Sequence, residues 1–475
     1  MSDRYENPLC KRYASTEMQS IFSDDNKFST WRKLWIALAE SQKELGIDIS
    51  DEQIAVMKKY ENDINYEDAR KFENETRHDV MSHILAYGKQ CPAAKPIIHL
   101  GATSSYVGDN TDIIIQREAL LRIKKLLINA IDKLSLFAEK YKALPCLAFT
   151  HFQAAQPVTM GKRACTWIQD LVLDLEQLDF ILKNFKFFGC RGTTGTSASF
   201  LSLFEGDHEK VKKLEKMIAE KMGFDSIYPV SGQVYSRKAD YYVLSVLSGI
   251  AQSAYKFSND IRLLSHLKEI DEPFEELQVG SSAMAYKRNP IRSERIASLA
   301  RFIMVDVLNP ALTASSQWLE RTLDDSANRR ITIPEAFLAA DSILSLLINI
   351  SSGMSINENI VKMNLNKEIP FMVTENILMY CVKKGGDRQV LHERIRLHSL
   401  DAIKEIKENG RENDLIDRII NDSEFFLTRD EIDKLINAEL FTGCAKEQTE
   451  DYLLMVKDIL IKNESLLGID VNIKV

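Results

Sequence analysis

The sequence is poor in glycine and proline, with 19 glycines and 11 prolines among 475 residues. Together these residues reach about half of their average usage, and several long segments contain neither. Because glycine and proline are the residues that most often interrupt helices, long helices should dominate, and strand patterns are sparse. We therefore expect an all-α protein that is long enough to form two or three domains.

Cysteine is scarce as well, and it never occurs in a Cys-x-x-Cys or Cys/His cluster. The seven positions are 10, 91, 146, 165, 190, 381 and 444. Reduced and mostly buried thiols are expected from this distribution, and a structural zinc site is not. The sequence indicates no metal and no other cofactor.

Clusters of positive charge and long apolar runs are also missing. The net charge of −8, without a run of Lys/Arg interleaved with aromatics, argues against nucleic acid as a partner, so any anion site must be a local basic pocket. The first six residues lack the apolar core of a signal peptide, which favours a cytoplasmic location. The most apolar long segment, residues 336–354, is interrupted by Asp341, Ser342, Ser345 and Asn349. It predicts a buried helix and no membrane span.

What is present is a set of long helical patterns. Residues 111–144 contain neither Gly nor Pro, and their inward positions recur every seven residues. One series is Ile113, Leu120, Leu127, Leu134 and Tyr141, and the other is Gln116, Ile123, Ala130 and Phe137. This spacing predicts a bundle helix about 45 Å long.

Further helices are expected over residues 163–188, 236–269, from Pro290 onward and over 334–352, which makes a central bundle of five long antiparallel helices. A shorter helix is expected from Ser29, as its cap, to Leu45. The predicted domains are an N-terminal helical domain (1–104), the bundle (105–355) and a C-terminal helical cap domain (356–475). Helices of this length often associate with copies of themselves, so we expect a homo-oligomer.

The most informative stretch is residues 280–290, Gly-Ser-Ser-Ala-Met-Ala-Tyr-Lys-Arg-Asn-Pro, which we call the signature loop. Its glycine and serines indicate a mobile loop, and Asn289 and Pro290 suit the cap and first position of a following helix. Lys287, Arg288 and nearby arginines would surround that positive helix end, so an anion is the expected guest. Judged by composition alone, a solvated interhelical loop is the alternative.

This pattern resembles the signature of the fumarase/aspartase superfamily, whose members release fumarate by breaking a C–N or C–O bond. The Tyr-Lys-Arg-Asn-Pro ending and the following Ile-Arg-Ser-Glu-Arg are similar, more narrowly, to adenylosuccinate lyases. One departure is Ala285, where the family usually has proline, a change that could loosen the loop. The resemblance implies a three-domain fumarase/aspartase-like fold and a homotetramer whose active sites each draw on three subunits.

A second signature lies at residues 149–157, Phe-Thr-His-Phe-Gln-Ala-Ala-Gln-Pro. Pro145 and Pro157 bracket this stretch, which predicts a loop at the bundle end where His151 is free to titrate. Without the resemblance, a capping or surface histidine would be the preferred interpretation. With it, Thr-His-x-Gln followed by Gln-Pro matches the second superfamily motif.

Two stretches near residue 100 also match the family. Residues 76–83 are predicted as helix, with Asp79 and His83 one turn apart, and His78-Asp79 looks like the histidine that lines the family's substrate pocket. Residues 99–105 form a small-residue loop in which Thr103 and Ser104 match positions that contact the succinyl group. A structural histidine and a domain-linking turn are the alternatives.

The mixed-charge run at residues 319–330 would ordinarily be a solvated helix face. By resemblance, Arg321, Ser326 and Arg330, joined by Arg12 and Tyr13, bind the nucleotide phosphate, and bidentate guanidinium contacts suit that role. Gln233 matches a glutamine that contacts the substrate. Residues 192–197 superficially resemble a phosphate loop but lack the Gly-Lys-Ser/Thr ending, so a packed interhelical turn is expected.

The resemblance also implies the chemistry. Ser281 is the general base and His151 the general acid, with His78 on the leaving-group side, Lys287 among the groups that stabilise the carbanion and Glu294 orienting a histidine. The implied catalytic residues are His151, Ser281, His78, Lys287 and Glu294. The implied substrate-binding residues are Arg12, Tyr13, Arg77, Asp79, Thr103, Ser104, Thr150, Gln233, Asn289, Arg295, Arg321, Ser326 and Arg330.

The expected reaction is elimination of fumarate from adenylosuccinate, giving AMP, and from succinylaminoimidazole carboxamide ribotide, giving AICAR, in purine biosynthesis. Argininosuccinate lyase, fumarase or aspartase activity is an alternative that the signature loop does not exclude. The phosphate-binding set argues against the last two, whose substrates carry no phosphate. A structural protein that has lost activity, like the lens crystallins of this superfamily, is a third reading, against which the five retained catalytic residues argue.

Overall fold

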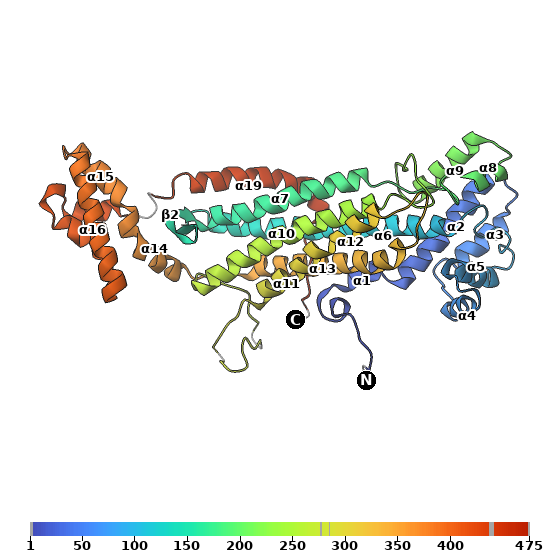
Figure 1. Ribbon diagram of the computed structural model, residues 1–475, viewed down its shortest axis with the longest axis horizontal. Coiled ribbons are helices and arrows are strands. Elements are labelled where there is room, and N and C mark those ends of the chain that lie inside the picture. Colours follow the sequence, from blue (N-terminus) through green and yellow to red (C-terminus); the bar gives the residue numbers. More distant parts are fainter. Residues whose placement is uncertain (1–2, 276–277, 285, 437–440, 474–475) are drawn as a thin grey trace.

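The computed structural model describes residues 3–473 except 276–277, 285 and 437–440. The chain is mostly helical and elongated, with a central bundle along its long axis (Figure 1). The composition therefore predicted the fold class correctly. Ala285, the departure from the family pattern, lies outside the described residues.

Five long helices build the bundle: α6 (Ser104–Lys140), α7 (Met160–Asn184), α10 (Lys238–His266), α11 (Ile291–Asp306) and α13 (Asp325–Gly353). Helix α6 packs on α7 and α13, while α11 packs between α10 and α13. Both seven-residue series predicted for α6 are buried along their whole length. The helix is longer than predicted, about 55 Å at 1.5 Å per residue, because it begins at Ser104 and not near Thr111.

Helix α13 was expected to start at Pro334, but it begins at Asp325 and continues through this proline. Proline removes one helical hydrogen bond, yet Ile333, Ala336 and Phe337 are buried around it and hold both halves in the core. By length and composition, α13 and the segment Ile291–Ser315 could cross a membrane, but 83% of the apolar window of α13 is buried within the protein. The prediction of a buried core helix is confirmed.

The N-terminal part contains η1 (Leu9–Tyr13), α1 (Thr16–Ile21), α2 (Asp24–Glu44), α3 (Asp51–Lys59), α4 (Tyr66–Thr76) and α5 (Asp79–Gln90). The predicted start of α2 at Ser29 was wrong. Ser23 caps the helix by accepting the N–H of Asn26, and Ser29 is buried inside it. A second serine six residues upstream gives the same local signal, and only the hydrogen bond distinguishes the two.

The predicted helix over residues 76–83 is also interrupted. Helix α4 ends at Thr76, Arg77 adopts a left-handed conformation (φ 54°), and His78 caps α5. His83 stacks on Phe28 with 3.8 Å between ring centroids, and burial lowers the pKa of His83 to about 4. His83 is therefore a structural histidine, and His78 is held apart from it at a helix start.

The stretch around His151 is a β-hairpin where a loop was expected. Strand β1 (Pro145–Thr150) pairs antiparallel with β2 (Gln153–Thr159), and His151 and Phe152 make the turn with φ values of 52° and 58°. Positive φ at both turn residues gives a tight turn that matches strand twist, although His-Phe is not a sequence signal for it. A second short pairing joins β3 (Ile270–Asp271) to β4 (Ser355–Ile356).

Helices α8 (Ala198–Leu203), α9 (His208–Lys221) and α12 (Leu308–Ser315) lie between the bundle helices in sequence. The C-terminal part begins with α14 (Glu358–Met372), α15 (Thr374–Lys383), α16 (Arg388–Asn409), α17 (Leu415–Ile420), η2 (Ser423–Phe425) and α18 (Arg429–Leu435). A hydrophobic core of its own, made by buried side chains between Val373 and Ile432, holds most of these helices together.

The chain then returns to the bundle, where α19 (Ala445–Lys462) packs on α6 and α7 and is followed by η4 (Glu464–Leu466) (Figure 1). The boundaries of the three domains stay a prediction. All seven cysteines are free thiols, and five of them are buried, as the scattered spacing predicted.

Candidate active site

The predicted site residues fall into three groups in this chain. The first group lies where α5, α6 and α13 begin, the second lies on the β1–β2 hairpin, and the third surrounds the signature loop and the start of α11. Members of the first group are Arg77, His78, Asp79, Thr103, Ser104, Gln233, Arg321, Ser326 and Arg330. The second group is Thr150 and His151, and the third is Ser281, Lys287, Asn289, Glu294, Arg295, Arg12 and Tyr13.

His78 is oriented by the helix that it caps. Its Nδ1 accepts the N–H of Met81 at 3.2 Å, so the neutral ring carries its proton on Nε2, which lies 3.4 Å from Ser104 Oγ. Asp79 begins α5 beside it, and Asp79 Oδ2 accepts from Arg330 Nη2 at 3.0 Å. Three helix starts therefore bring a histidine, a hydroxyl, a carboxylate and a guanidinium to one place.

Other members of the first group flank this cluster. Thr103 precedes the first residue of α6, and its side chain makes no capping hydrogen bond. Gln233 is held by its backbone, whose N–H donates to the Glu320 carbonyl at 3.0 Å. A Cβ on Gly232 would lie 2.5 Å from the same carbonyl, so only glycine allows this approach. Arg77 is exposed at the end of α4.

The predicted phosphate-binding residues come from two segments, the start of α13 with the residues before it, and η1. Ser326 lies in the first turn of α13, and Arg321 Nη1 donates to Asp325 Oδ2 at 3.1 Å just before it. A helix start of this kind favours an anion. Arg12 and Tyr13 are in η1, which packs on α13, and the Tyr13 ring lies 5.7 Å from the guanidinium of Arg295 on α11.

The second group is far from the first. His151 is exposed at the hairpin tip, and the hairpin follows the C-terminal end of α6, whereas Ser104 is its first residue. The length of α6 separates them by about 55 Å. Figure 1 shows the hairpin and the α5 region at opposite ends of the bundle. One chain therefore does not bring His78 and His151 together.

The signature loop is closed at its base. Asn289 Nδ2 donates to the Gly280 carbonyl at 2.8 Å, and a Cβ on Gly280 would lie only 2.3 Å from the Lys287 carbonyl oxygen. Within the loop, Ser281 Oγ accepts the N–H groups of Met284 at 3.1 Å and Ala283 at 3.4 Å. Asn289 therefore ties the loop and does not cap α11, contrary to the prediction.

The start of α11 is capped by Glu272, a residue that the sequence analysis missed. Glu272 accepts the N–H of Arg292 at 3.0 Å, and the N–H and hydroxyl of Ser293 at 2.7 and 2.5 Å. Burial raises the pKa of this carboxyl. The prediction that the N-terminal end of α11 binds an external anion was therefore wrong. Glu272 is distant in sequence from the helix that it caps, so no local capping pattern could reveal it.

The basic side chains predicted around this helix end take separate positions. The Arg292 guanidinium is buried and donates to the Pro273 carbonyl at 2.7 Å. Lys287 and Glu294 are exposed. Burial lowers the pKa of Arg295, Tyr13 opposes this shift and the nearby charge of Arg12 adds to it. A bound anion beside Arg12 and Arg295 would relieve their mutual repulsion.

Comparison with known proteins agrees with this architecture. Residues 11–305 match the family described as "Lyase", and residues 370–452 match "Adenylosuccinate lyase C-terminus". Among solved structures, the 3-carboxy-cis,cis-muconate lactonizing enzyme from Pseudomonas putida superposes with a TM-score of 0.81 at 21% identity, covering 95% of this chain and 99% of that one. This likeness supports the fold alone. The fold and the family match define a lyase of the fumarase/aspartase superfamily.

Within that superfamily the similarity is specific. The chain is 50% identical over 454 residues to adenylosuccinate lyase of Saccharomyces cerevisiae, covering 95% of this chain and 94% of that protein. It is also 50% identical over 452 residues to the enzyme of the same name from Schizosaccharomyces pombe, covering 94% of each. The chain belongs to the adenylosuccinate lyase family.

Proposed function

We propose that the protein cleaves adenylosuccinate to AMP and fumarate, and succinylaminoimidazole carboxamide ribotide to AICAR and fumarate, in cytoplasmic purine biosynthesis. The observation that carries this proposal is 50% identity along nearly the whole chain to proteins named adenylosuccinate lyase. The phosphate-binding set supports a nucleotide substrate, because Arg321 and Ser326 lie at the start of α13.

In the proposed elimination, a base removes a proton from the carbon next to a succinyl carboxylate. A C=C bond forms, the C–N bond breaks, and its electron pair goes to the nitrogen, which takes a proton from the acid. We assign Ser281 as the base. The two backbone N–H groups that donate to its Oγ favour the charged form of this hydroxyl, as a base requires.

The carbanion intermediate needs positive charge or N–H donors nearby. Glu272 already accepts the N–H groups at the start of α11, so we assign stabilisation of the carbanion to Lys287 and Asn289 in the signature loop. Loop movement is required, since Lys287 is exposed in the described arrangement and water must be excluded for a hydroxyl to act as a base. Glu294 is assigned to orient a histidine.

His151 is the proposed acid that protonates the departing nitrogen. His78, whose Nε2 carries the proton in the neutral ring, supports the leaving-group side. Thr103, Ser104 and Thr150 are assigned to the succinyl carboxylates. Arg77, Asp79, Gln233 and Arg295 complete the substrate contacts.

We infer that the active enzyme is a homotetramer with shared sites. His78 and His151 lie at opposite ends of α6, so a site that uses both must take them from different chains. The segment Ile291–Ser315 supports assembly, since only 39% of its apolar window is buried within one chain. Its exposed apolar side chains include Phe302, Val305, Leu308 and Leu312. A second copy would cover this surface.

The first experiment follows the ultraviolet spectrum of adenylosuccinate with purified protein and assays fumarate in the products. Wild type should convert the substrate, and His151→Ala should lower kcat by about 10² to 10⁴-fold, the usual contribution of a general acid. His208→Ala is the matched control, because His208 is exposed at the start of α9. No conversion by folded wild type would refute the proposed function and direct the assay to argininosuccinate.

Mixing two inactive variants tests the shared sites. If His78→Ala and His151→Ala chains are dissociated and reassembled together, about one site in four should receive both intact histidines from different chains, by random assortment in a symmetric oligomer. Activity should therefore return to about a quarter of wild type. Mixtures that stay inactive although mixed tetramers form would contradict sharing of these two histidines.

A further inference from the structure

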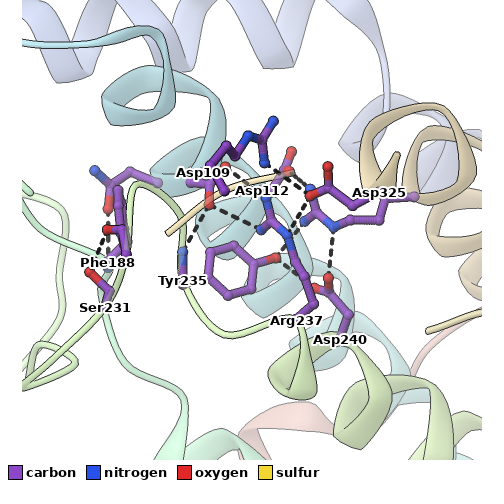
Figure 2. A network of polar contacts seen from close by, with 12 residues as sticks. Asp109, Asp112, Phe188, Ser231, Tyr235, Arg237, Asp240 and Asp325 are labelled. Carbon is purple, nitrogen blue, oxygen red and sulfur yellow. Dashed lines mark hydrogen bonds and ion pairs between the residues drawn. The ribbon is translucent and has the colours of Figure 1, made fainter. Parts of the chain in front are cut away.

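A buried polar network joins Asp109, Arg237 and Asp325, which come from α6, the start of α10 and α13 (Figure 2). Its centre is Arg237 at the start of α10, whose side chain is 1% exposed. Arg237 Nη1 and Nη2 donate to the carboxylate of Asp109 on α6 at 3.0 and 3.3 Å, and its Nε donates to Asp325 Oδ2 at 2.6 Å. Three bundle helices are thus joined by one guanidinium.

Asp325 links this network to the partly exposed Arg321. The side chain of Asp325 is fully buried, and Oδ2 accepts both from Arg237 and from Nη1 of Arg321 at 3.1 Å. Arg321 is partly exposed, with 24% of its side chain accessible. A chain of charge-assisted hydrogen bonds therefore runs from the buried Asp109 through Arg237 and Asp325 to an arginine at the proposed phosphate site.

We propose that Asp325 is a positioning residue for the substrate phosphate, acting through Arg321; this rests on the proposed function. A partly exposed arginine samples many rotamers, and immobilising it on binding lowers affinity. Arg237 fixes the Asp325 carboxylate, and the carboxylate fixes one side of the Arg321 guanidinium. Because a guanidinium has five N–H donors in a rigid plane, its remaining donors stay available for the phosphate.

A neighbouring branch of the network offers a matched control. Arg329 Nε donates to Asp240 Oδ2 at 2.7 Å, and Arg329 Nη1 pairs with Asp112 at 2.9 Å. Asp112 is 40% exposed and belongs to the same network, but its ion pair is with Arg329 and not with Arg321. Asp112→Asn therefore removes a carboxylate charge from the network and leaves the Asp325–Arg321 pair intact.

The test compares steady-state kinetics on adenylosuccinate and on succinyladenosine, which lacks the phosphate. Asp325→Asn should raise KM for adenylosuccinate about tenfold, the loss expected for a hydrogen bond to a charged group, and leave kcat within about a factor of two. KM for succinyladenosine should not change, and Asp112→Asn should leave both constants near wild type. In the Arg321→Ala background, adding Asp325→Asn should raise KM no further, because the two residues act as one unit.

Asp325→Glu provides a second variant, because it keeps a negative charge beside the buried Arg237 and so protects folding. Its longer side chain displaces the carboxylate, and KM for adenylosuccinate should again rise, with succinyladenosine unaffected. An unchanged KM for adenylosuccinate in either folded variant, or fully multiplicative effects in the double variant, would overturn the inference. Failure of wild type to cleave adenylosuccinate would instead refute the proposed function, so the two failures are distinguishable.

Discussion

Replacing Gly280 by alanine tests whether catalysis depends on the closed base of the signature loop. The added Cβ would lie 2.3 Å from the Lys287 carbonyl oxygen and 3.3 Å from the Phe274 ring. Non-bonded carbon and oxygen atoms approach to about 3.3 Å, so the two sides of the loop must separate by about 1 Å. The bond from Asn289 Nδ2 to the Gly280 carbonyl, now 2.8 Å, would then exceed hydrogen-bond length.

This displacement reaches the proposed reacting groups directly. Ser281 follows Gly280, and Lys287 and Asn289 form the opposite side of the loop. A misplacement of about 1 Å can cost about 10²-fold in rate, so kcat of Gly280→Ala should fall by about that factor. Global stability should change little, because much of the loop is exposed and lies outside the bundle core.

The assay measures kcat by fumarate release and stability by thermal unfolding. Gly108→Ala is the matched control, because a Cβ on this α6 glycine meets nothing within 4 Å in the described part of the chain. It should leave kcat unchanged and stabilise the helix by up to about 1 kcal/mol. A Gly280→Ala enzyme with wild-type kcat would refute the reasoning, because it would show that the close approach at the loop base is not needed for turnover.

Two further predictions concern stability. Glu272→Ala removes the cap from α11 and should lower the unfolding free energy by about 1–2 kcal/mol in denaturant titration. The control is Glu275→Ala, which removes a 76% exposed partner of Arg292 and should lower the unfolding free energy by less than about 1 kcal/mol. Equal losses in the two variants would contradict the capping role of Glu272. Burial raises the pKa of Asp174 on α7 to about 6. Its folded pKa lies above its unfolded value, so its contribution to stability is present at low pH and is lost as pH rises from about 4 to 6. Asp174→Asn should therefore melt at a higher temperature than wild type near pH 7.5, with the gain shrinking toward about pH 5, and a gain independent of pH would argue against this titration.

Patterns within one element were predicted well. Helix α6 has its inward residues seven apart, and these residues are buried as expected because helical periodicity alone decides which side chains share a face. Helix ends were predicted less well. Ser23 and Ser29 offer the same capping hydroxyl, and Pro334 looked like a helix start although the core holds a helix on both sides of it.

Contacts between residues that are distant in sequence were the main features that the sequence did not predict. Glu272 lies next to Arg292 and Ser293 only because the chain folds back between β3 and α11. Asp109, Arg237 and Asp325 come from three helices, and nothing in their local sequence marks them as partners. The sequence motifs single out none of the three, and only the fold buries them together in one network.

The sequence by itself determined the helical class, the buried faces of the long helices and the motif residues, because periodicity and short motifs depend on neighbours in the chain. Only the tertiary structure decided which residues meet. It separated His78 from His151 along α6, placed Tyr13 beside Arg295, and placed Glu272 at the α11 start. The physical reason is that the packing of helices and the path of the connecting loops set these distances. Both bring together residues that are distant in sequence, so no local sequence pattern predicts the contacts.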